Sequence, residues 1–240
     1  MKVLHVITRL DLGGAQQNTL DSVRAHQRGN LGAGLAAGSG GRLDTEAQRI
    51  IRRFFPLRHL VHPLSPVRDV LAMFELVRLF RTLRPSLVHS HSSKAGVLGR
   101  LAAWTARVPV LVHTVHGWSF NPTQPWPLRT LYLVLERFLA AKTDVLVAVA
   151  ESDIRLGLAA GIGEAAQYRL IRSAMDLKAF KPRGSKIGAE DWGWSRGTPL
   201  VGCLGNLKGQ KDPLAFVRVA ARIAKIRPGA DCGYRAAEAA

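Results

Sequence analysis

Short apolar runs alternate with longer amphipathic segments along most of the chain. Short runs of Val, Leu and Ile are typical of buried strands, and apolar positions repeating every three or four residues are typical of helices. Strands are predicted at 2–8, 31–37, 59–62, 86–90, 108–114, 144–150 and 168–173. Helices are predicted at 14–28, 43–54, 67–83, 94–106, 127–141 and 152–160. This alternation predicts an α/β fold, a doubly wound parallel sheet with helices on both faces.

The pattern changes near residue 180. The next residues carry Gly, Pro, Ser and mixed charges, which is typical of a linker. One strand, a Gly- and Lys-rich turn and one helix at 213–226 follow, and then "GADCGYRAAEAA", which has no β-branched residue. We expect a Rossmann-like domain at 1–180, a linker at 181–198 and the truncated start of a second Rossmann-like domain at 199–240.

Composition adds an excess of positive charge. The chain has 34 Lys and Arg against 17 Asp and Glu, a formal net charge of +17. Such a charge favours an anionic partner, which is a nucleic acid, a phosphate-rich ligand or an acidic membrane surface. No nucleic-acid-reading motif accompanies the charge, so no nucleic-acid partner is expected.

Cysteine usage and hydropathy bear on the compartment. Cys203 and Cys232 are too few for a disulfide framework, which is consistent with a reducing cytosol. No apolar run approaches the ~20 residues that cross a bilayer. His5 interrupts the first apolar run, so the N-terminus predicts a strand rather than a secretory signal. We expect a cytoplasmic protein that is at most peripheral on the inner face of the plasma membrane.

Glycines and histidines follow two of the predicted strands. In open parallel sheets, ligands bind at the carboxyl ends of the strands. Gly13 and Gly14 precede a helix, where the backbone approaches a ligand closely and free N–H groups suit a phosphate; a plain glycine turn is the alternative. In "HTVHGWSF", His116 before Gly117 is the expected cleft residue, whereas His113 is expected to pack.

Two more histidines end the strand at 86–90. Because side chains alternate along a strand, His89 and His91 are expected on the same face. A zinc site would need a third ligand that the sequence does not assign, so no metal is expected. The alternative is one imidazole in a hydrogen-bond network and one at the cleft, with Ser92 or Ser93 as the N-cap of the next helix.

Two common nucleotide-binding motifs are missing. No G-x-G-x-x-G sequence joins a predicted strand to a helix, which disfavours a nicotinamide enzyme. The segment "GNLKGQK" lacks the G-K-[ST] ending of a phosphate-binding P-loop, which disfavours an NTPase.

Six segments, in order, resemble the N-terminal half of the family 4 glycosyltransferases, two-domain enzymes of the GT-B type. They are "VLHVITRLDLGGAQ", "SLVHSHSSKAGVLGRLAA", "VHTVHGWSF", "DVLVAVAESD", "LIRSAMDLKAF" and "VGCLGNLKGQKDPL". The resemblance covers residues 1 to about 227. The segments "HSSKAGVLGR" and "HGWSF" indicate the subgroup that builds bacterial surface polysaccharides.

This resemblance implies a retaining transfer of sugar from a nucleotide-sugar donor to a saccharide acceptor, often lipid-linked, without a cofactor or an obligatory metal. It implies that His116 is the catalytic histidine and contacts the transferred sugar. It also implies that Lys211 neutralises the donor diphosphate, while the arginine that usually precedes this lysine by five residues is Asn206 here. The expected donor- or acceptor-binding residues are Gly13, Gly14, His91, Lys94, Gly117, Asn206 and Lys211.

The paired-glutamate motif of the donor site would lie downstream of this sequence. The chain as given is therefore expected to bind UDP- or GDP-sugars poorly and to be inactive in transfer. The alternative function is a non-catalytic remnant or binding module that recognises a lipid-linked or polyanionic partner.

Clustered arginines beside apolar residues suit an anionic membrane surface. The alternative is that Phe54 and Phe55 belong to the core and the arginines are merely solvated. The expected membrane-contact residues are Arg49, Arg52, Arg53, Arg78, Arg81, Arg84 and Trp126.

Overall fold

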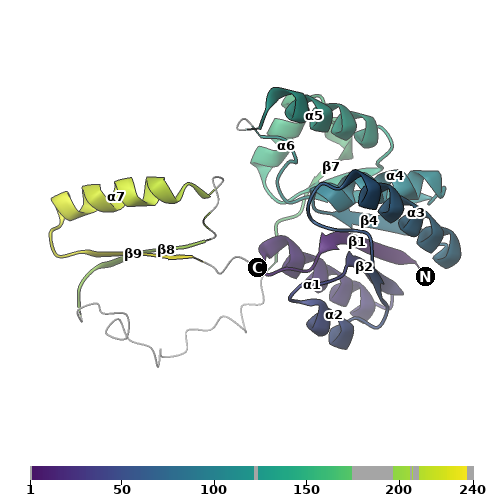
Figure 1. The fold of residues 1–240 in the computed structure, drawn as a ribbon, viewed down its shortest axis with the longest axis horizontal. Coiled ribbons are helices and arrows are strands. Elements are labelled where there is room, and N and C mark those ends of the chain that lie inside the picture. The colour runs from purple at the N-terminus through teal and green to yellow at the C-terminus, as the bar shows by residue number, and fades with distance from the viewer. Residues whose placement is uncertain (1, 122–123, 175–196, 206, 208–210, 237–240) are drawn as a thin grey trace. The chain divides into compact units, whose positions relative to one another are not determined.

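The computed structural model describes residues 2–121, 124–174, 197–205, 207 and 211–236 of the chain. The chain divides into two compact units, Met1–Ala174 and Met175–Ala240 (Figure 1). The linker expected at 181–198 lies almost wholly outside the described residues.

The first unit is built on a parallel sheet. Within its described residues the sheet has seven strands in the order β3-β2-β1-β4-β5-β6-β7. The strands are β1 (Val3–Arg9), β2 (Ala33–Gly38), β3 (Phe54–Leu57), β4 (Leu87–His91), β5 (Val110–Val115), β6 (Val145–Ala148) and β7 (Tyr168–Leu170). The helices are α1 (Gly14–Arg28), α2 (Asp44–Ile50), α3 (Pro66–Leu83), α4 (Ser93–Thr105), α5 (Trp126–Ala140) and α6 (Glu151–Ala159), with a short 3₁₀ turn, η1 (Ala165–Gln167).

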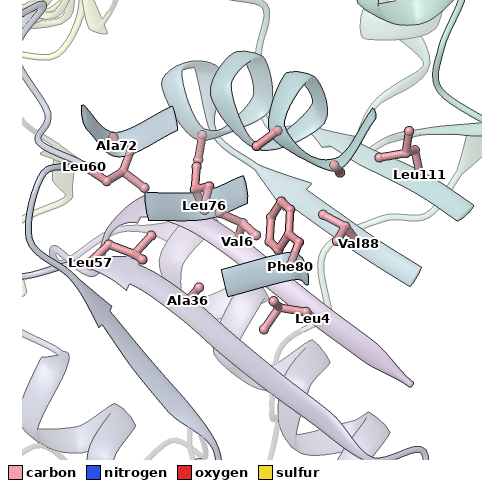
Figure 2. Close-up of a cluster of buried hydrophobic side chains, with 13 residues drawn as sticks. Leu4, Val6, Ala36, Leu57, Leu60, Ala72, Leu76, Phe80, Val88 and Leu111 are labelled. Carbon is pink, nitrogen blue, oxygen red and sulfur yellow. The ribbon is translucent and has the colours of Figure 1, made fainter. Parts of the chain in front are cut away.

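Alternate residues of β1 enter two different cores. Leu4 and Val6 pack in a cluster with Phe80 and other residues of α3 and α4 (Figure 2). Ile7 packs on the opposite face with residues of α1 and α2, among them Leu20. A sheet buried on both faces explains the nearly continuous apolar run of this strand. The doubly wound α/β fold is confirmed.

The predicted strand at 59–62 is wrong. The strand in this region is β3, because the aromatic residues from Phe54 suit a pleated strand and pair in parallel with β2. Helix α2 consequently ends at Ile50, earlier than its apolar period predicted. The chain then passes close to Gly38, where an added Cβ would clash with the Leu60 carbonyl oxygen.

The second unit contains a βαβ arrangement in its described residues. Strand β8 (Leu200–Gly205), helix α7 (Pro213–Ile226) and strand β9 (Asp231–Ala236) follow one another, and the two strands pair in parallel. The sequence predicted a single strand and helix, and that was wrong for 231–236. The segment has no β-branched residue, so it forms a strand through its backbone pairing with β8 rather than through intrinsic propensity.

Candidate functional site

The loops that were expected to bind ligands follow three neighbouring strands. Strands β1, β4 and β5 lie side by side and run parallel, so their carboxyl ends meet at one edge of the sheet. Gly13 and Gly14 follow β1, Lys94 follows β4, and His116 and Gly117 follow β5. The fold therefore brings these predicted site residues to the same edge.

Hydroxyl groups tie two of these loops together. Thr8 Oγ1 lies 2.8 Å from Ser92 Oγ and accepts a hydrogen bond of 3.0 Å from the Ala95 backbone N–H. Ser92 is the N-cap residue of α4, with a left-handed φ of 61°, but its side chain makes no cap hydrogen bond. It accepts from the Thr8 backbone N–H instead. The first turn of α4 is thus capped from β1.

Four imidazoles join end to end beneath these loops. His5 Nε2 lies 3.0 Å from His26 Nδ1, and His5 Nδ1 lies 3.0 Å from His91 Nε2. His91 Nδ1 in turn lies 3.3 Å from His116 Nε2. The rings come from α1, β1, β4 and the residue after β5. We call His26, His5, His91 and His116 the histidine chain.

His89 lies beside the histidine chain. Its ring centroid is 4.2 Å from that of His91 and 4.9 Å from that of His5, and its Nε2 lies 2.7 Å from Thr114 Oγ1. The expectation that His89 and His91 share a face of β4 is confirmed by this approach of their rings.

Burial keeps these imidazoles uncharged at neutral pH. It lowers the pKa of His89 to about 3 and that of His116 to about 4. The pKa values of His5 and His91 are well below the ordinary value, because burial and neighbouring histidines both disfavour the cation. The pKa of His26 is lowered by burial too. Each ring therefore carries one N–H donor and one lone-pair acceptor.

The structure supplies the third histidine that the sequence did not assign. In the described part of the chain, His5, His89 and His91 place one ring nitrogen each within 4.8 Å of one another, a spacing that could hold a metal ion. The signal was present in the sequence, since His5 stands in the middle of an otherwise apolar strand. His26 was also missed, because a single histidine on an amphipathic helix carries no pattern that separates it from a solvated surface residue.

A second polar network lies on the opposite side of the sheet. Ser90 Oγ lies 3.0 Å from His113 Nδ1, so His113 packs as expected. Arg100 Nη2 donates to Glu136 Oε2 at 2.6 Å, and Glu136 Oε1 accepts from Ser119 Oγ at 3.0 Å. Glu136 therefore anchors the segment that follows the predicted catalytic histidine. Sequence reasoning missed this pair, although the arginine stands among small apolar residues of its helix.

Two predicted binding residues, Lys94 and Gly117, differ in how free they are to contact a ligand. Lys94 Nζ donates to Asp69 Oδ1 at 2.6 Å and to the Pro63 carbonyl, so its charge is already partnered. Gly117 has a φ of +114°, a conformation that favours glycine, and an added Cβ there would meet no atom within 4 Å. As ligand contacts, both stay predictions.

The remaining predicted site residues have few described neighbours or lie outside the described residues. An added Cβ at Gly14 would meet no atom within 4 Å, while one at Gly13 would meet only the flexible Gln16 side chain. Lys211 is exposed, in the second unit. Asn206 lies outside the described residues.

The predicted membrane-contact residues are all exposed. Phe54 and Phe55 are partly buried and pack against the two cores, which agrees with the alternative for these two rings. Whether the arginines contact a membrane stays a prediction. A different apolar surface is open on α3, where Val67, Leu71 and Phe74 are 74%, 41% and 68% exposed. The exposed basic residues are Arg49, Arg52, Arg53, Arg78, Arg81 and Arg84, and Trp126 is exposed with them.

Comparison with known proteins identifies the family. Residues 12–178 match the family model described as Glycosyltransferase Family 4. The chain belongs to Glycosyltransferase Family 4. No helix in the described part of this family 4 chain is long and apolar enough to span a membrane.

Relatives of this family 4 chain are longer than it is. UDP-Gal:alpha-D-GlcNAc-diphosphoundecaprenol alpha-1,3-galactosyltransferase from Escherichia coli is 29% identical over 222 residues, covering 92% of this chain and 57% of the relative. The capsular polysaccharide biosynthesis glycosyltransferase CapM from Staphylococcus aureus is 29% identical over 84 residues, covering 35% and 22% of the two chains. The present chain thus spans a little over half of the galactosyltransferase.

The fold is also similar to that of solved structures. HepE from Anabaena, solved in complex with UDP-glucose, superposes with a TM-score of 0.76 at 19% identity, covering 98% of this chain and 60% of HepE. This likeness supports the Rossmann-like GT-B architecture expected from the sequence.

Proposed function

We propose that this chain is the acceptor-side part of a retaining glycosyltransferase that moves a sugar from a nucleotide sugar to a lipid-linked saccharide in cell-surface polysaccharide synthesis. The observation that carries the proposal is the meeting of three loops at one sheet edge, with neutral His116 beside them. The names of the relatives support the substrate classes, since one is a galactosyltransferase acting on a diphosphoundecaprenol-linked sugar and another was solved with UDP-glucose.

The residues at the edge suit the two halves of such a reaction. The loop of Gly13 and Gly14 leaves space above the N-terminus of α1, where backbone N–H groups and the helix dipole attract a diphosphate. His116 offers a positioned polar contact to the sugar. The departing diphosphate accepts the proton of the acceptor hydroxyl. Lys211 lies in the second unit, and its neutralisation of that diphosphate stays a prediction from the family resemblance. In this scheme no metal ion or cofactor takes part.

The acceptor's lipid implies contact with a membrane. Val67, Leu71 and Phe74 recur at helical spacing and form an exposed apolar stripe on α3. Arg78 and Arg81 continue along the same helix and are exposed as well. An amphipathic helix of this composition suits the surface of an anionic leaflet. We place the membrane-contact surface here, with the inner face of the plasma membrane as its partner.

A binding module that transfers nothing remains the second candidate function. The partnered charge of Lys94 favours it in one respect, because one of the cations expected at a phosphate is already neutralised by Asp69. Both candidates predict binding of the lipid-linked saccharide, and only the first predicts chemistry. Product formation therefore separates the two.

The test measures binding and transfer in turn. The 240-residue chain is titrated with a short-chain, water-soluble prenyl-diphosphate saccharide, and saturable binding that weakens in His116→Ala but not in His62→Ala is expected. Transfer of labelled sugar from UDP-sugars to that acceptor is then measured with the same chain and with a chimera carrying the second half of the Escherichia coli galactosyltransferase. Absence of binding contradicts the proposal. Binding without transfer in an otherwise folded, donor-binding chimera supports the binding module.

The inactivity expected for the 240-residue chain stays a prediction. It is measured by the same assay, because the chimera and the chain differ only in their donor-side residues. Donor-dependent product formed by the chain alone would show that the expectation is wrong.

A further inference from the structure

The histidine chain has a directional connectivity. Each link joins Nδ1 of one ring to Nε2 of the next, from His26 through His5 and His91 to His116. Both nitrogens of the two central rings are used. Since a neutral imidazole has one donor and one acceptor, each link fixes the tautomer of the next ring. The histidine chain can therefore exist in two states, with the proton on Nε2 of all four rings or on Nδ1 of all four rings.

The links have the geometry of hydrogen bonds. The centroids of His5 and His91 are 5.3 Å apart and their bonded nitrogens 3.0 Å apart, and for His91 and His116 the values are 5.6 and 3.3 Å. In both links the centroid–centroid distance exceeds the nitrogen–nitrogen distance by the sum of the distances from each ring centroid to its own bonded nitrogen. The two bonded nitrogens therefore lie on the line that joins the ring centroids. Such a linear arrangement is what an N–H···N hydrogen bond prefers.

A metal ion fits the same rings less well. Two nitrogens bound to zinc at about 2.0–2.1 Å subtend a tetrahedral angle at the ion, so their rings fold toward each other and the centroids come closer than a linear link allows. The link between His5 and His91 shows no such folding. The group formed with His89 also contains no carboxylate that would offset the charge of a divalent cation.

The two states differ at the site end of the chain. In the Nε2–H state, His116 donates from Nε2 to His91 and keeps a lone pair on Nδ1. In the Nδ1–H state, His116 Nε2 accepts from His91 and Nδ1 becomes a donor. The state of the histidine chain thus determines whether His116, the predicted catalytic histidine, offers an acceptor or a donor to a ligand.

Two helix ends favour one of these states. His26 lies in the last turn of α1, which carries the negative pole of the helix dipole, and His91 directly precedes the N-cap of α4, a positive pole. In the Nε2–H state all N–H vectors point from His116 toward His26, that is, toward the negative pole. The helix fields therefore favour this state.

We propose that the histidine chain holds His116 in its Nε2–H tautomer, so that Nδ1 is a lone-pair acceptor for a hydroxyl group of the substrate. His26, His5 and His91 are then positioning residues that act through His116. The identity of the ligand at His116 rests on the proposed function, whereas the coupling between the rings does not.

The test reads the tautomer of each ring from the nitrogen-15 shifts of ¹⁵N-histidine in the 240-residue chain at neutral pH. Protonated and lone-pair imidazole nitrogens resonate far apart, and single substitutions assign the signals. His5, His91 and His116 are expected as Nε2–H tautomers. Opposite tautomers in two linked rings of the wild type overturn the proposal without any variant.

Two substitutions of the half-buried His26 are then expected to select opposite tautomer states of the histidine chain. In His26→Glu, a pure acceptor faces His5 and the Nε2–H state is kept. In His26→Lys, a pure donor faces His5, and His116 is expected to switch to Nδ1–H although two rings lie between. The control is His62→Lys, an exposed residue outside the chain, and the unchanged signals of His113 report an intact fold.

Three results overturn or isolate the inference. The same His116 tautomer in the Glu and Lys variants overturns it. Zinc chloride that shifts His5, His89 and His91 together into a metal-bound pattern overturns it as well, in favour of a metal site. The measurement needs no substrate, so tautomers that follow the prediction in a protein that binds no acceptor refute the proposed function alone.

Discussion

Arg100 on α4 donates to Glu136 on α5 across 2.6 Å, with only 1% and 2% of the two side chains exposed. Two charges taken out of water depend on each other, because either one left alone has neither its partner nor solvent. The same glutamate holds Ser119, so the pair links the core between two helices to the segment that follows His116.

Loss of one member of this pair should destabilise the fold strongly. For Glu136→Gln or Arg100→Ala we expect the free energy of unfolding to fall by about 3–5 kcal/mol, the usual cost of an uncompensated buried charge. Urea denaturation measures it. The control is Arg155→Ala, which breaks the exposed pair with Glu151 and should change the free energy by less than about 1 kcal/mol. Equal effects at both sites would contradict the burial argument.

Acid should weaken the fold in the range where free histidine titrates. The unfolded chain binds protons near pH 6.5, whereas the pKa values of His5 and His91 are well below that in the folded chain. The unfolded state therefore gains more protons as pH falls, and stability that is complete above about 6.5 is lost below it, by about 1.4 kcal/mol per pH unit for each such histidine.

Denaturation series between pH 7 and 5 measure this slope. The control His62→Ala removes an exposed histidine and should leave the slope unchanged. A free energy of unfolding that stays constant across this range would show that the imidazoles are not held neutral by folding.

Two glycines of α4 should respond differently to the same substitution. A Cβ at Gly96 would lie 2.6 Å from His113 Cε1, so Gly96→Ala should destabilise by about 1–3 kcal/mol through overpacking. At Gly99 the nearest atom is 3.6 Å away, an ordinary contact, and Gly99→Ala should be neutral or slightly stabilising because alanine favours the helix. Thermal unfolding of the two variants compares them directly. A reversed order would mean that His113 has room to move.

Removal of the predicted catalytic histidine should affect turnover rather than folding. In the active chimera, His116→Ala is expected to lower kcat by roughly ten- to a thousandfold, as for loss of one positioned polar contact to the transition state. His59→Ala, outside the histidine chain, serves as the control. Turnover within about twofold of the parent would assign His116 a structural role.

Vesicle binding should depend on acidic lipid and on the face of α3. The chain is expected to co-sediment with anionic vesicles and little with neutral ones, and salt should weaken binding because the attraction is screened beyond about 8 Å at physiological ionic strength. The double substitution Arg78→Glu with Arg81→Glu should release it. Arg52→Glu with Arg53→Glu is the matched pair on the second predicted basic cluster. Equal loss from both pairs would indicate diffuse charge, and no binding at all would contradict a membrane surface.

The main part of the fold follows from local pattern, because most of the buried strands are short runs rich in apolar residues, bounded by polar ones. Where the pattern failed, pairing across the sheet decided the outcome. β3 forms at Phe54–Leu57 because it meets β2 there, and β9 forms from a segment without β-branched residues because β8 offers its edge. Such preferences belong to two segments together and are not visible in either one.

The site was predictable as a location but not as a network. The order of strands and loops places His91 and His116 at one edge, which the parallel-sheet rule anticipates. The links to His5 and His26 depend on strand register and on the rotation of α1 about its axis. Neither the register nor the rotation can be predicted from the spacing of the histidines along the sequence.

The strand order also bears on how the chain is made. β1 lies in the middle of the sheet, yet its second neighbour β4 is synthesised much later, and His5 and His91 are 86 residues apart. During translation, one edge of β1 stays unpaired until that neighbour has left the ribosome, and an unpaired apolar edge invites association with other chains. The imidazole of His5 puts a polar group in the middle of this unpaired strand. The side chain that links the rings of the finished site therefore also lowers the tendency of the nascent strand to associate with other chains.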